Sequence, residues 1–333
     1  MEYIVTAGEE ANQVADFSTP VTGVGIVSTT KASVGGSNAE ALETIRKNAP
    51  SFYQTQGRAV TAKDYESFVK QQLVGVVSNV WGGEDNFPTP HYGRVFVTAV
   101  STNRQMLSSD QKTEIIDFMK TKAVVSIIPE FVDPVPIDIM ISGLINYNAL
   151  DLETTEDELG NKITSYIETF PLGVFEEVFD YGLFSSRILA LDPSILGLSL
   201  SVWLQQIKEA SPNNKLFAFE IPFRNKLKES GGLPGTVLET NRFLVEEGGG
   251  LIQVYLIDDG IGLVQMRREG GNNPDSIVRN VGTIDYINGI IHVDGVVIVS
   301  DIEVRVAPFS NVVRASGPLM LALKDQGIIL KSV

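Results

Sequence analysis

The sequence predicts a multidomain α+β protein, in which serial β-α-β open-faced sandwich units are followed by a β-rich C-terminal domain with hairpins. The first observation is a repeated helix-start signal, Ser or Thr with Glu or Gln three residues later, between segments of strand pattern. The second is a C-terminal third with alternating apolar residues and tight-turn pairs. The length of 333 residues also exceeds one ordinary hydrophobic core. We expect domains at residues 1–132, 133–212 and 213–333, with a polar boundary stretch at 210–215.

Strands and two helices are expected at the start of the first domain. The strands are predicted at residues 2–7 and 21–30. Ser37 and Glu40 form a capping box that opens a helix to about Lys47. Pro50 should end that helix, because the residue before a proline avoids helical backbone angles.

The second of these helices begins after Thr61, which is a good N-cap residue. Asp64 places a carboxylate at the third helical position, near the positive end of the helix dipole. The apolar residues of this helix fall on one face: Tyr65, Phe68, Val69 and Leu73.

Two β-α-β units follow in series and predict open-faced sandwiches with antiparallel sheets. Their strands are expected at residues 74–81, 94–100, 126–132, 137–147 and 198–204. One helix is opened by the capping box of Ser108 and Gln111, and another by that of Thr155 and Glu158. Pro171 ends the latter, and a further helix is expected at residues 181–191.

The last domain is predicted to be built from hairpins. A strand is expected at residues 216–223, and strands at 251–257 and 261–266 flank the turn Asp258-Asp259-Gly260. Strands at 283–287 and 290–293 flank Asn288-Gly289, which is the preferred pair for a type I′ turn. Asp294-Gly295 gives a second tight turn or a bulge before a strand at 296–299.

The charge balance disfavours several classes of partner. The formal net charge is −15, and such a surface repels phosphate backbones and anionic membranes. We therefore expect no nucleic acid and no membrane as partner, and the negative surface serves solubility or docks a basic partner. The chain has no cysteine, which excludes disulfides and thiolate chemistry. No apolar run approaches the roughly 20 residues of a membrane span.

A search for catalytic residues yields none. His91 and His292 are the two histidines, and their separation excludes a short metal-binding pair. The adjacent carboxylate pairs are Glu176-Glu177, Glu246-Glu247 and Asp258-Asp259. Neighbouring residues of a strand point to opposite faces, so these pairs do not form the two-carboxylate cleft of a glycosidase. We expect solvated surface for all three, with turn chemistry for Asp258-Asp259.

Cofactor and metal motifs are also missing from the sequence. Gly23 and Gly25 lack a third glycine, Gly248-Gly249-Gly250 precedes a strand, and no phosphate-binding loop pattern occurs. The oxygen ligands of Glu84-Asp85-Asn86 and Asp157-Glu158 fit no EF-hand loop. We therefore expect no catalytic residues, no cofactor, no small-molecule substrate and no metal.

The segment 58–66, R-A-V-T-A-K-D-Y-E, just after Asn48-Ala49-Pro50, resembles the baseplate J-like proteins of contractile-tailed phages. The likeness extends from about residue 21 to about residue 203. A second segment, V-G-T-I-D-Y-I-N-G-I-I at residues 281–291, is similar to a hairpin of the large baseplate wedge proteins of myophages. The β-rich part at residues 215–333 departs from the smaller J-like proteins and points to the larger wedge proteins.

The resemblance implies a non-enzymatic structural protein of the virion tail baseplate, assembled in the host cytoplasm. It implies a homodimer whose copies link neighbouring wedges into a ring around the tail tube, contacts with other wedge proteins, and rearrangement when the sheath contracts. A strand at the very start, with no element before it to pair with, indicates a C-terminal fragment of a longer wedge protein.

Two alternatives remain open from the sequence. The β-rich C-terminal third would suit a receptor- or glycan-binding tail adhesin, although this third has no Trp and only Tyr255 and Tyr286 as tyrosines. The less favoured alternative is a cell-wall hydrolase, since phage tails can include such enzymes.

Overall fold

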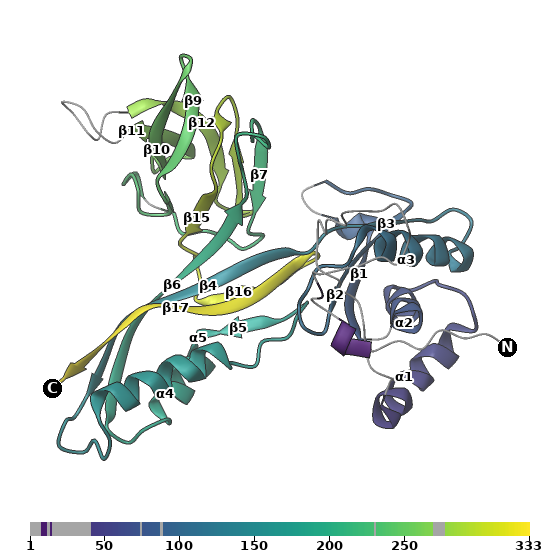
Figure 1. Ribbon diagram of the computed structural model, residues 1–333, viewed down its shortest axis with the longest axis horizontal. Helices are drawn as coiled ribbons and strands as arrows, with labels where there is room; N and C mark the ends of the chain where they lie inside the picture. The colour runs from purple at the N-terminus through teal and green to yellow at the C-terminus, as the bar shows by residue number, and fades with distance from the viewer. Residues whose placement is uncertain are drawn as a thin grey trace, which may run out of the picture. The chain divides into compact units, whose positions relative to one another are not determined.

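The structure, a computed structural model, describes residues 8–11, 14, 41–73, 75–86, 89–229, 231–268 and 277–333. The chain forms two compact units, Met1–Val135 and Pro136–Val333 (Figure 1). The predicted division of the second of these at residue 212 stays a prediction. The predicted strands at 2–7 and 21–30, the capping residues Ser37 and Glu40, and Gly23 and Gly25 lie outside the described residues.

The first unit combines helices with a small sheet (Figure 1). Its elements are η1 (Gly8–Ala11), α1 (Leu42–Thr55), α2 (Ala62–Gln72), β1 (Val76–Gly82), η2 (Gly83–Asp85), β2 (Arg94–Ser101), α3 (Ser109–Lys122) and β3 (Ile128–Phe131). The sheet order is β1-β2-β3. Strand β1 is antiparallel to β2, from Val76 opposite Ser101 to Gly82 opposite Val95.

Strands β2 and β3 are parallel, with Arg94 opposite Ile128. The prediction of antiparallel sheets is therefore wrong for this pair. The reason is the connection: α3 lies between the two strands in the chain, and a helical crossover returns the chain to the same end of the sheet.

The core of the first unit lies between the sheet and helices α2 and α3. Its buried members are Ala59, Tyr65, Phe68, Val69, Val80, Val97, Ala99, Leu107, Ile115 and Met119. The predicted apolar face of α2 is thus confirmed, since Tyr65, Phe68 and Val69 are buried and Leu73 packs at the margin. Burial of such side chains stabilises a fold by about 1.5–3 kcal/mol each.

Helix α1 differs from its prediction. It begins at Leu42 after Ala41, which makes no side-chain cap, and continues through Pro50 to Thr55. Proline lacks the N–H that would bond to the carbonyl of Arg46, and it was expected to end the helix for that reason. The helix nevertheless continues to Thr55, so the predicted end near Lys47 is wrong.

The second unit contains a long sheet, two helices and many short strands (Figure 1). Its elements are β4 (Val135–Tyr147), α4 (Glu156–Glu168), β5 (Val178–Asp180), α5 (Tyr181–Leu189), β6 (Ile195–Lys208), β7 (Phe219–Pro222), β8 (Leu238–Thr240), β9 (Phe243–Glu247), β10 (Gly250–Asp258), β11 (Leu263–Arg268), β12 (Ile277–Asp285), β13 (Ile290–Val293), β14 (Val297–Ile298), β15 (Ile302–Val306), β16 (Val312–Arg314) and β17 (Leu319–Ser332). The predicted α+β class is confirmed.

Strands β17, β4 and β6 form one end of this sheet. Strand β4 is antiparallel to β6, from Asp138 opposite Gln205 to Asn146 opposite Gly197. Helix α4 contacts β17, and helix α5 contacts β6. The inward faces hold Ile139 and Ile141 on β4, Leu159 and Ile163 on α4, and Phe184 on α5, all buried.

The remaining strands continue the sheet in the order β15-β8-β10-β11-β12-β13-β7, with β9 paired to β10 and β14. Together they curl into the β-rich part (Figure 1). The predicted hairpin of β10 and β11 is confirmed, with Asp258 opposite Val264. The continuity with β6 comes from β15, where Val306 pairs with Leu204.

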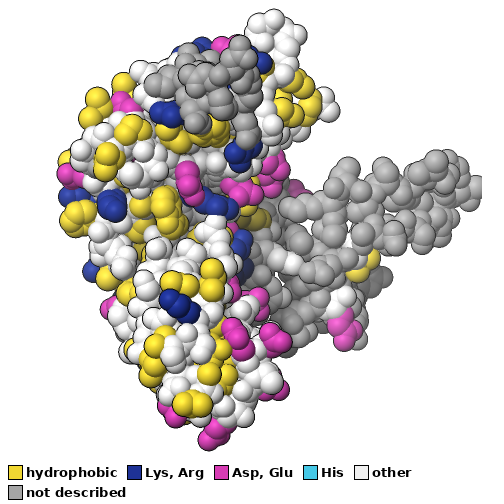
Figure 2. All heavy atoms as spheres, turned by 90° about the vertical axis from the view of Figure 1, so that its left-hand side faces the viewer, with side chains coloured by type: hydrophobic (Ala, Val, Ile, Leu, Met, Phe, Trp, Pro, Cys, Tyr) yellow, Lys and Arg dark blue, Asp and Glu magenta, His cyan; other side chains and the backbone are white. Residues whose placement is uncertain are grey.

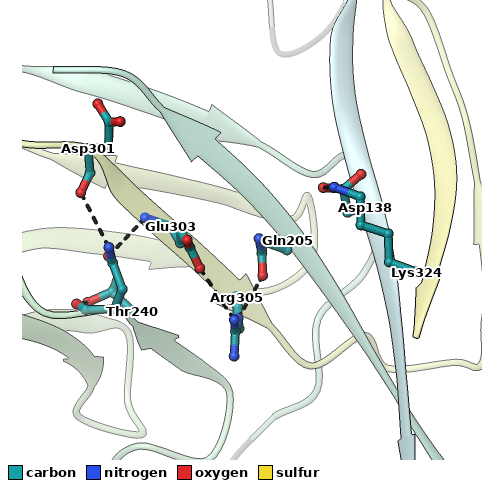
Figure 3. A network of polar contacts seen from close by, with 8 residues as sticks. Asp138, Gln205, Thr240, Asp301, Glu303, Arg305 and Lys324 are labelled. Atoms are coloured by element: carbon teal, nitrogen blue, oxygen red, sulfur yellow. Dashed lines mark hydrogen bonds and ion pairs between the residues drawn. The ribbon is translucent and has the colours of Figure 1, made fainter. Parts of the chain in front are cut away.

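A polar network lies at this junction between the two parts of the sheet (Figure 3). The Nε of Arg305 on β15 donates to Gln205 Oε1 on β6 at 2.7 Å. The neighbouring Glu303 accepts from the same guanidinium at 3.3 Å. Because Gln205 is buried, this bond satisfies a side-chain oxygen that would otherwise be costly to desolvate.

The turn between β12 and β13 also differs from its prediction. Asp285 pairs with Ile290, so the loop spans residues 286–289. Gly289 has φ of 64°, but Asn288 does not have the positive φ that a type I′ turn requires. The Asp285 carboxylate accepts from the backbone N–H groups of Ile287 and Asn288, and this Asx-type turn replaces the two-residue turn.

Gly289 and Gly295 provide a matched pair for a stability test. Both have positive φ, 64° and 65°, but a Cβ at Gly289 would lie 2.0 Å from the carbonyl oxygen of Asn225, while one at Gly295 meets nothing within 4 Å. Gly295→Ala should cost about 1–2 kcal/mol from backbone strain alone. Gly289→Ala should lower the free energy of urea unfolding by clearly more. Equal costs would contradict the close approach at Gly289.

Candidate functional site

The histidines singled out in the sequence do not lie in a catalytic arrangement. His91 is an exposed loop residue of the first unit, with its ring 5.9 Å from that of Phe96. His292 is an exposed residue of β13 in the second unit, and its Nε2 lies 3.0 Å from Glu220 Oε1 across the sheet. Each is explained by a local structural contact.

Two of the three carboxylate pairs are used in structural contacts. Glu246 Oε2 lies 2.5 Å from Lys215 Nζ, and Glu247 Oε1 lies 3.7 Å from Arg279 Nε. Asp259 Oδ1 accepts three backbone N–H bonds in the turn before β11, so the predicted turn chemistry is confirmed there. Glu176 is exposed, and Glu177 is half-buried.

Asp258 corrects the prediction of a solvated pair. Its exposure is 0%, and its Oδ1 accepts from the backbone N–H groups of Val237 and Leu238 at 3.1 and 3.0 Å. The carboxylate therefore fixes the start of β8 against β10. Sequence pattern could not show this, since the donors lie about 20 residues earlier in the chain.

No group of three or more metal-ligating side chains of the kind His, Cys, Asp or Glu comes together among the described residues. Every described helix is too short or too polar to cross a membrane.

The signature segment 58–66 builds the entry to α2. Ala59 is buried, and its N–H donates to the carbonyl of Lys122 at the end of α3 at 2.9 Å. Thr61 Oγ1 accepts from Asp64 N at 3.3 Å, and Asp64 Oδ2 accepts from Thr61 N at 2.8 Å. This is a complete capping box, so the predicted role of Thr61 as helix cap is confirmed.

The pKa values of two residues in the segment reflect this geometry. Partial burial of Asp64 acts to raise its pKa, but hydrogen bonds from the backbone of Thr61 and Val60 and from the Thr61 hydroxyl outweigh it, so the pKa lies below its ordinary value. Burial, and then the charge of Asp64, raise the pKa of Tyr65. The segment thus holds a charged cap beside a buried neutral phenol.

A groove lies between α1 and α2, directly beside the signature segment. Its volume is about 320 Å³. One wall is formed by α1 and the other by α2, and the lining residues are Ile45, Asn48, Ala49, Ser51, Phe52, Lys63, Glu66, Ser67, Lys70 and Gln71. The Phe52 ring meets the buried Phe68 ring edge-on, with centroids 6.0 Å apart.

This groove was not predicted from the sequence. The signal that could have found it is the spacing of Leu42, Ile45, Ala49 and Phe52, which alternates between three and four residues. That spacing marks an apolar helix stripe that meets another helix. It was hidden because Pro50 was expected to end the helix before Phe52.

The second segment with family resemblance, residues 281–291, forms the β12–β13 hairpin. Ile284, Asp285, Tyr286 and Ile287 line an open cavity of about 710 Å³ together with glycines of two neighbouring loops. The Tyr286 carbonyl accepts from Leu227 N at 2.7 Å, and Gly289 O accepts from Phe223 N at 2.8 Å. These bonds give the segment a structural role, which is to tie the loop after β7 to the curled sheet.

Acidic side chains gather toward the lower end of the face in Figure 2, where Figure 1 places the loop between β4 and α4. The exposed carboxylates of this stretch are Asp151, Glu153, Glu156, Asp157 and Glu158. Asp151 accepts from the Asn148 amide, and Glu158 accepts from Thr155 N in the predicted capping box. The stretch is a solvated negative surface that also starts α4.

Comparison with known proteins gives the same family for the residues that begin at the signature segment. Residues 61–132 match the family model described as baseplate structural protein gp6, C-terminal domain I. The chain is 24% identical over 263 residues to baseplate wedge protein gp6 of Enterobacteria phage T4. This alignment covers 74% of the chain but 38% of the relative.

A solved structure is also similar, the cryo-EM structure of the anti-feeding prophage (AFP) baseplate, 6-fold symmetrised. The TM-score is 0.37 at 16% identity, over 56% of this chain and 42% of that chain. The family model and the curated relative confirm the predicted resemblance to baseplate wedge proteins of contractile-tailed phages. They agree with a structural role in the tail baseplate of the virion.

The cap of α2 can be tested with a matched pair of threonines. Thr61→Ala removes the N-cap oxygen and should lower the free energy of unfolding by about 1 kcal/mol. Thr113 lies inside α3, where its hydroxyl donates to the carbonyl of Ser109. Thr113→Ala should cost less, because alanine favours helix interiors. Urea unfolding followed by circular dichroism measures both, and equal losses would contradict the capping role.

The charge of Asp64 gives a pH-dependent contribution. Its folded pKa is lowered, so its stabilisation is present above the unfolded pKa of about 3.9 and is lost as the pH falls through the folded value. Asp64→Asn keeps a hydrogen-bond acceptor without the charge. The difference in unfolding free energy between parent and variant should be largest near neutral pH and shrink below about pH 4. A difference independent of pH would contradict the argument.

Proposed function

We propose that this chain, a relative of the baseplate structural proteins of contractile-tailed phages, is a non-enzymatic component of the tail baseplate wedge. The observation that supports the proposal best is the family match over residues 61–132. That match starts at Thr61, the residue that caps α2 inside the signature segment. The sequence resemblance and the family match thus overlap in the signature segment.

A non-enzymatic role agrees with how the chemistry-bearing side chains are used. Asp258 fixes backbone groups of β8, and Asp259 holds a turn. Glu246 and Glu247 make ion pairs with Lys215 and Arg279, and His292 contacts Glu220 on the neighbouring strand. Each of these groups has a structural task in its own part of the fold.

The finer parts of the function extend the resemblance to this chain. Copies of the protein associate as homodimers and link neighbouring wedges into a ring around the tail tube. The ring contacts other wedge proteins and rearranges when the sheath contracts. The groove between α1 and α2 supports a role in protein contacts, because its apolar residues Ile45, Ala49 and Phe52 are exposed.

The proposal is tested in virions and in solution. Antibodies raised against the purified chain should label the baseplate end of tails by immunogold electron microscopy. Sedimentation of the chain over a wide range of concentration should show self-association. A strictly monomeric chain that also leaves the baseplate unlabelled would contradict the proposal.

A hydrolase assay serves as the control for the alternative function. Zymography on peptidoglycan should show no clearing by the purified chain. Clearing that survives further purification would replace the structural role with an enzymatic one.

A further inference from the structure

Helix α1 exposes an apolar stripe. Leu42, Ile45 and Phe52 are 62%, 44% and 39% exposed, and Ala49, which completes the stripe, is also exposed. Thr55 is the buried residue of the helix. A stripe at alternating three- and four-residue spacing is the seam that helices use to pack on one another. On α1 this seam is only partly covered, through the contact of Phe52 with Phe68.

Little else in its own sequence stabilises α1. The N-cap residue Ala41 offers no side-chain acceptor, and Pro50 removes a backbone hydrogen bond from the interior. Isolated helices shorter than about 12–15 residues are marginal in water, and most helical stability in proteins comes from packing of the apolar face. Burial of the exposed stripe against a partner would therefore stabilise α1.

The groove beside this stripe has the form of a helix-binding site. Its apolar side is made by Ile45, Ala49 and Phe52 on α1. The opposite wall, on α2, is polar and carries Lys63 and Lys70, one helical turn to either side of Glu66 and Ser67. An amphipathic helix laid here would meet apolar residues on one side and charges along its edge.

The charge of the groove differs from that of the whole chain. Lys63 and Lys70 are exposed and make no ion pair with a described residue, whereas Glu66 in the same wall is already engaged. The chain as a whole has a net charge of −15. The groove is therefore complementary to acidic side chains, which the rest of the surface repels.

We propose that the groove between α1 and α2 docks an amphipathic α-helix of another protein, with an apolar stripe flanked by carboxylates. The stripe covers Leu42, Ile45 and Phe52, and the carboxylates pair with Lys63 and Lys70. This inference names the class of partner for the proposed structural role and rests on it.

The proposal is tested with designed helical peptides as probes. One fluorescein-labelled peptide has Leu at heptad positions a and d with Glu at e and g, and a second differs only in Lys at e and g. The full chain should bind the Glu peptide about tenfold more tightly than the Lys peptide in fluorescence anisotropy. The difference should fall with added salt, because the ion pairs at the groove edge are exposed. Equal binding of the two peptides would overturn the proposal.

Matched variants locate the binding site. Leu42→Ser with Ile45→Ser should weaken binding of the Glu peptide about tenfold, since apolar contact area is lost. Ile261 and Ile287 are 79% and 72% exposed in the second unit, so Ile261→Ser with Ile287→Ser should leave binding unchanged. Lys63→Glu with Lys70→Glu should reverse the preference between the peptides. Circular dichroism confirms that the variants fold.

Two results would overturn the groove proposal while leaving the proposed function standing. The first is that the variant with Leu42→Ser and Ile45→Ser binds the Glu peptide as tightly as the parent chain, while antibodies against the parent chain still label the baseplate. The second is loss of self-association in that variant by sedimentation, which would assign the groove to a second copy of the chain. A missing baseplate label together with intact peptide binding would instead contradict the proposed function alone.

Discussion

The second unit depends on strand β6, because β6 is hydrogen-bonded to β4 along one edge and to β15 along the other and so joins the two parts of the sheet. Leu204 pairs with Ile139 of β4 and with Val306 of β15. The adjacent Gln205 is buried, and its side chain accepts from Arg305 (Figure 3). A buried amide without that partner would lose its hydrogen bonds to water and form none in exchange, which would destabilise the fold. The helix-covered strands and the curled strands therefore form a single sheet and not two separate ones.

The C-terminal strand β17 forms the end of that sheet next to β4. Lys324 of β17 pairs with Asp138 near the start of β4, and Val333 N donates to Tyr147 O at its end, so the two strands run parallel. As the last strand in the order, β17 has an edge that pairs with no other described strand. Asp325 accepts from the N–H groups of Gly327 and Ile328, and Gly327 has φ of 99°. Such a local irregularity and the flanking lysines are ways in which proteins prevent pairing of an open edge with other chains.

The sequence predicted best where the signal is local. The capping boxes at Ser108 and Thr155 start helices as expected, since their partners lie within one turn. Pairings between distant segments could not be predicted, because nothing in the sequence of β17 identifies β4, about 186 residues earlier, as its neighbour. The carboxylate of Asp258 was assigned to the surface for the same reason, because its partners belong to another strand. A local rule also failed at Pro50, because α1 continues through the proline to Thr55.

The signature segment and the groove have different roles in the first unit. Thr61 and Asp64 hydrogen-bond to each other, Tyr65 is buried, and the N–H of Ala59 donates to the end of α3. The segment therefore makes internal contacts. The family match begins at Thr61, after α1 has ended. The matched residues therefore build the scaffold that presents α1, while the apolar stripe lies outside them.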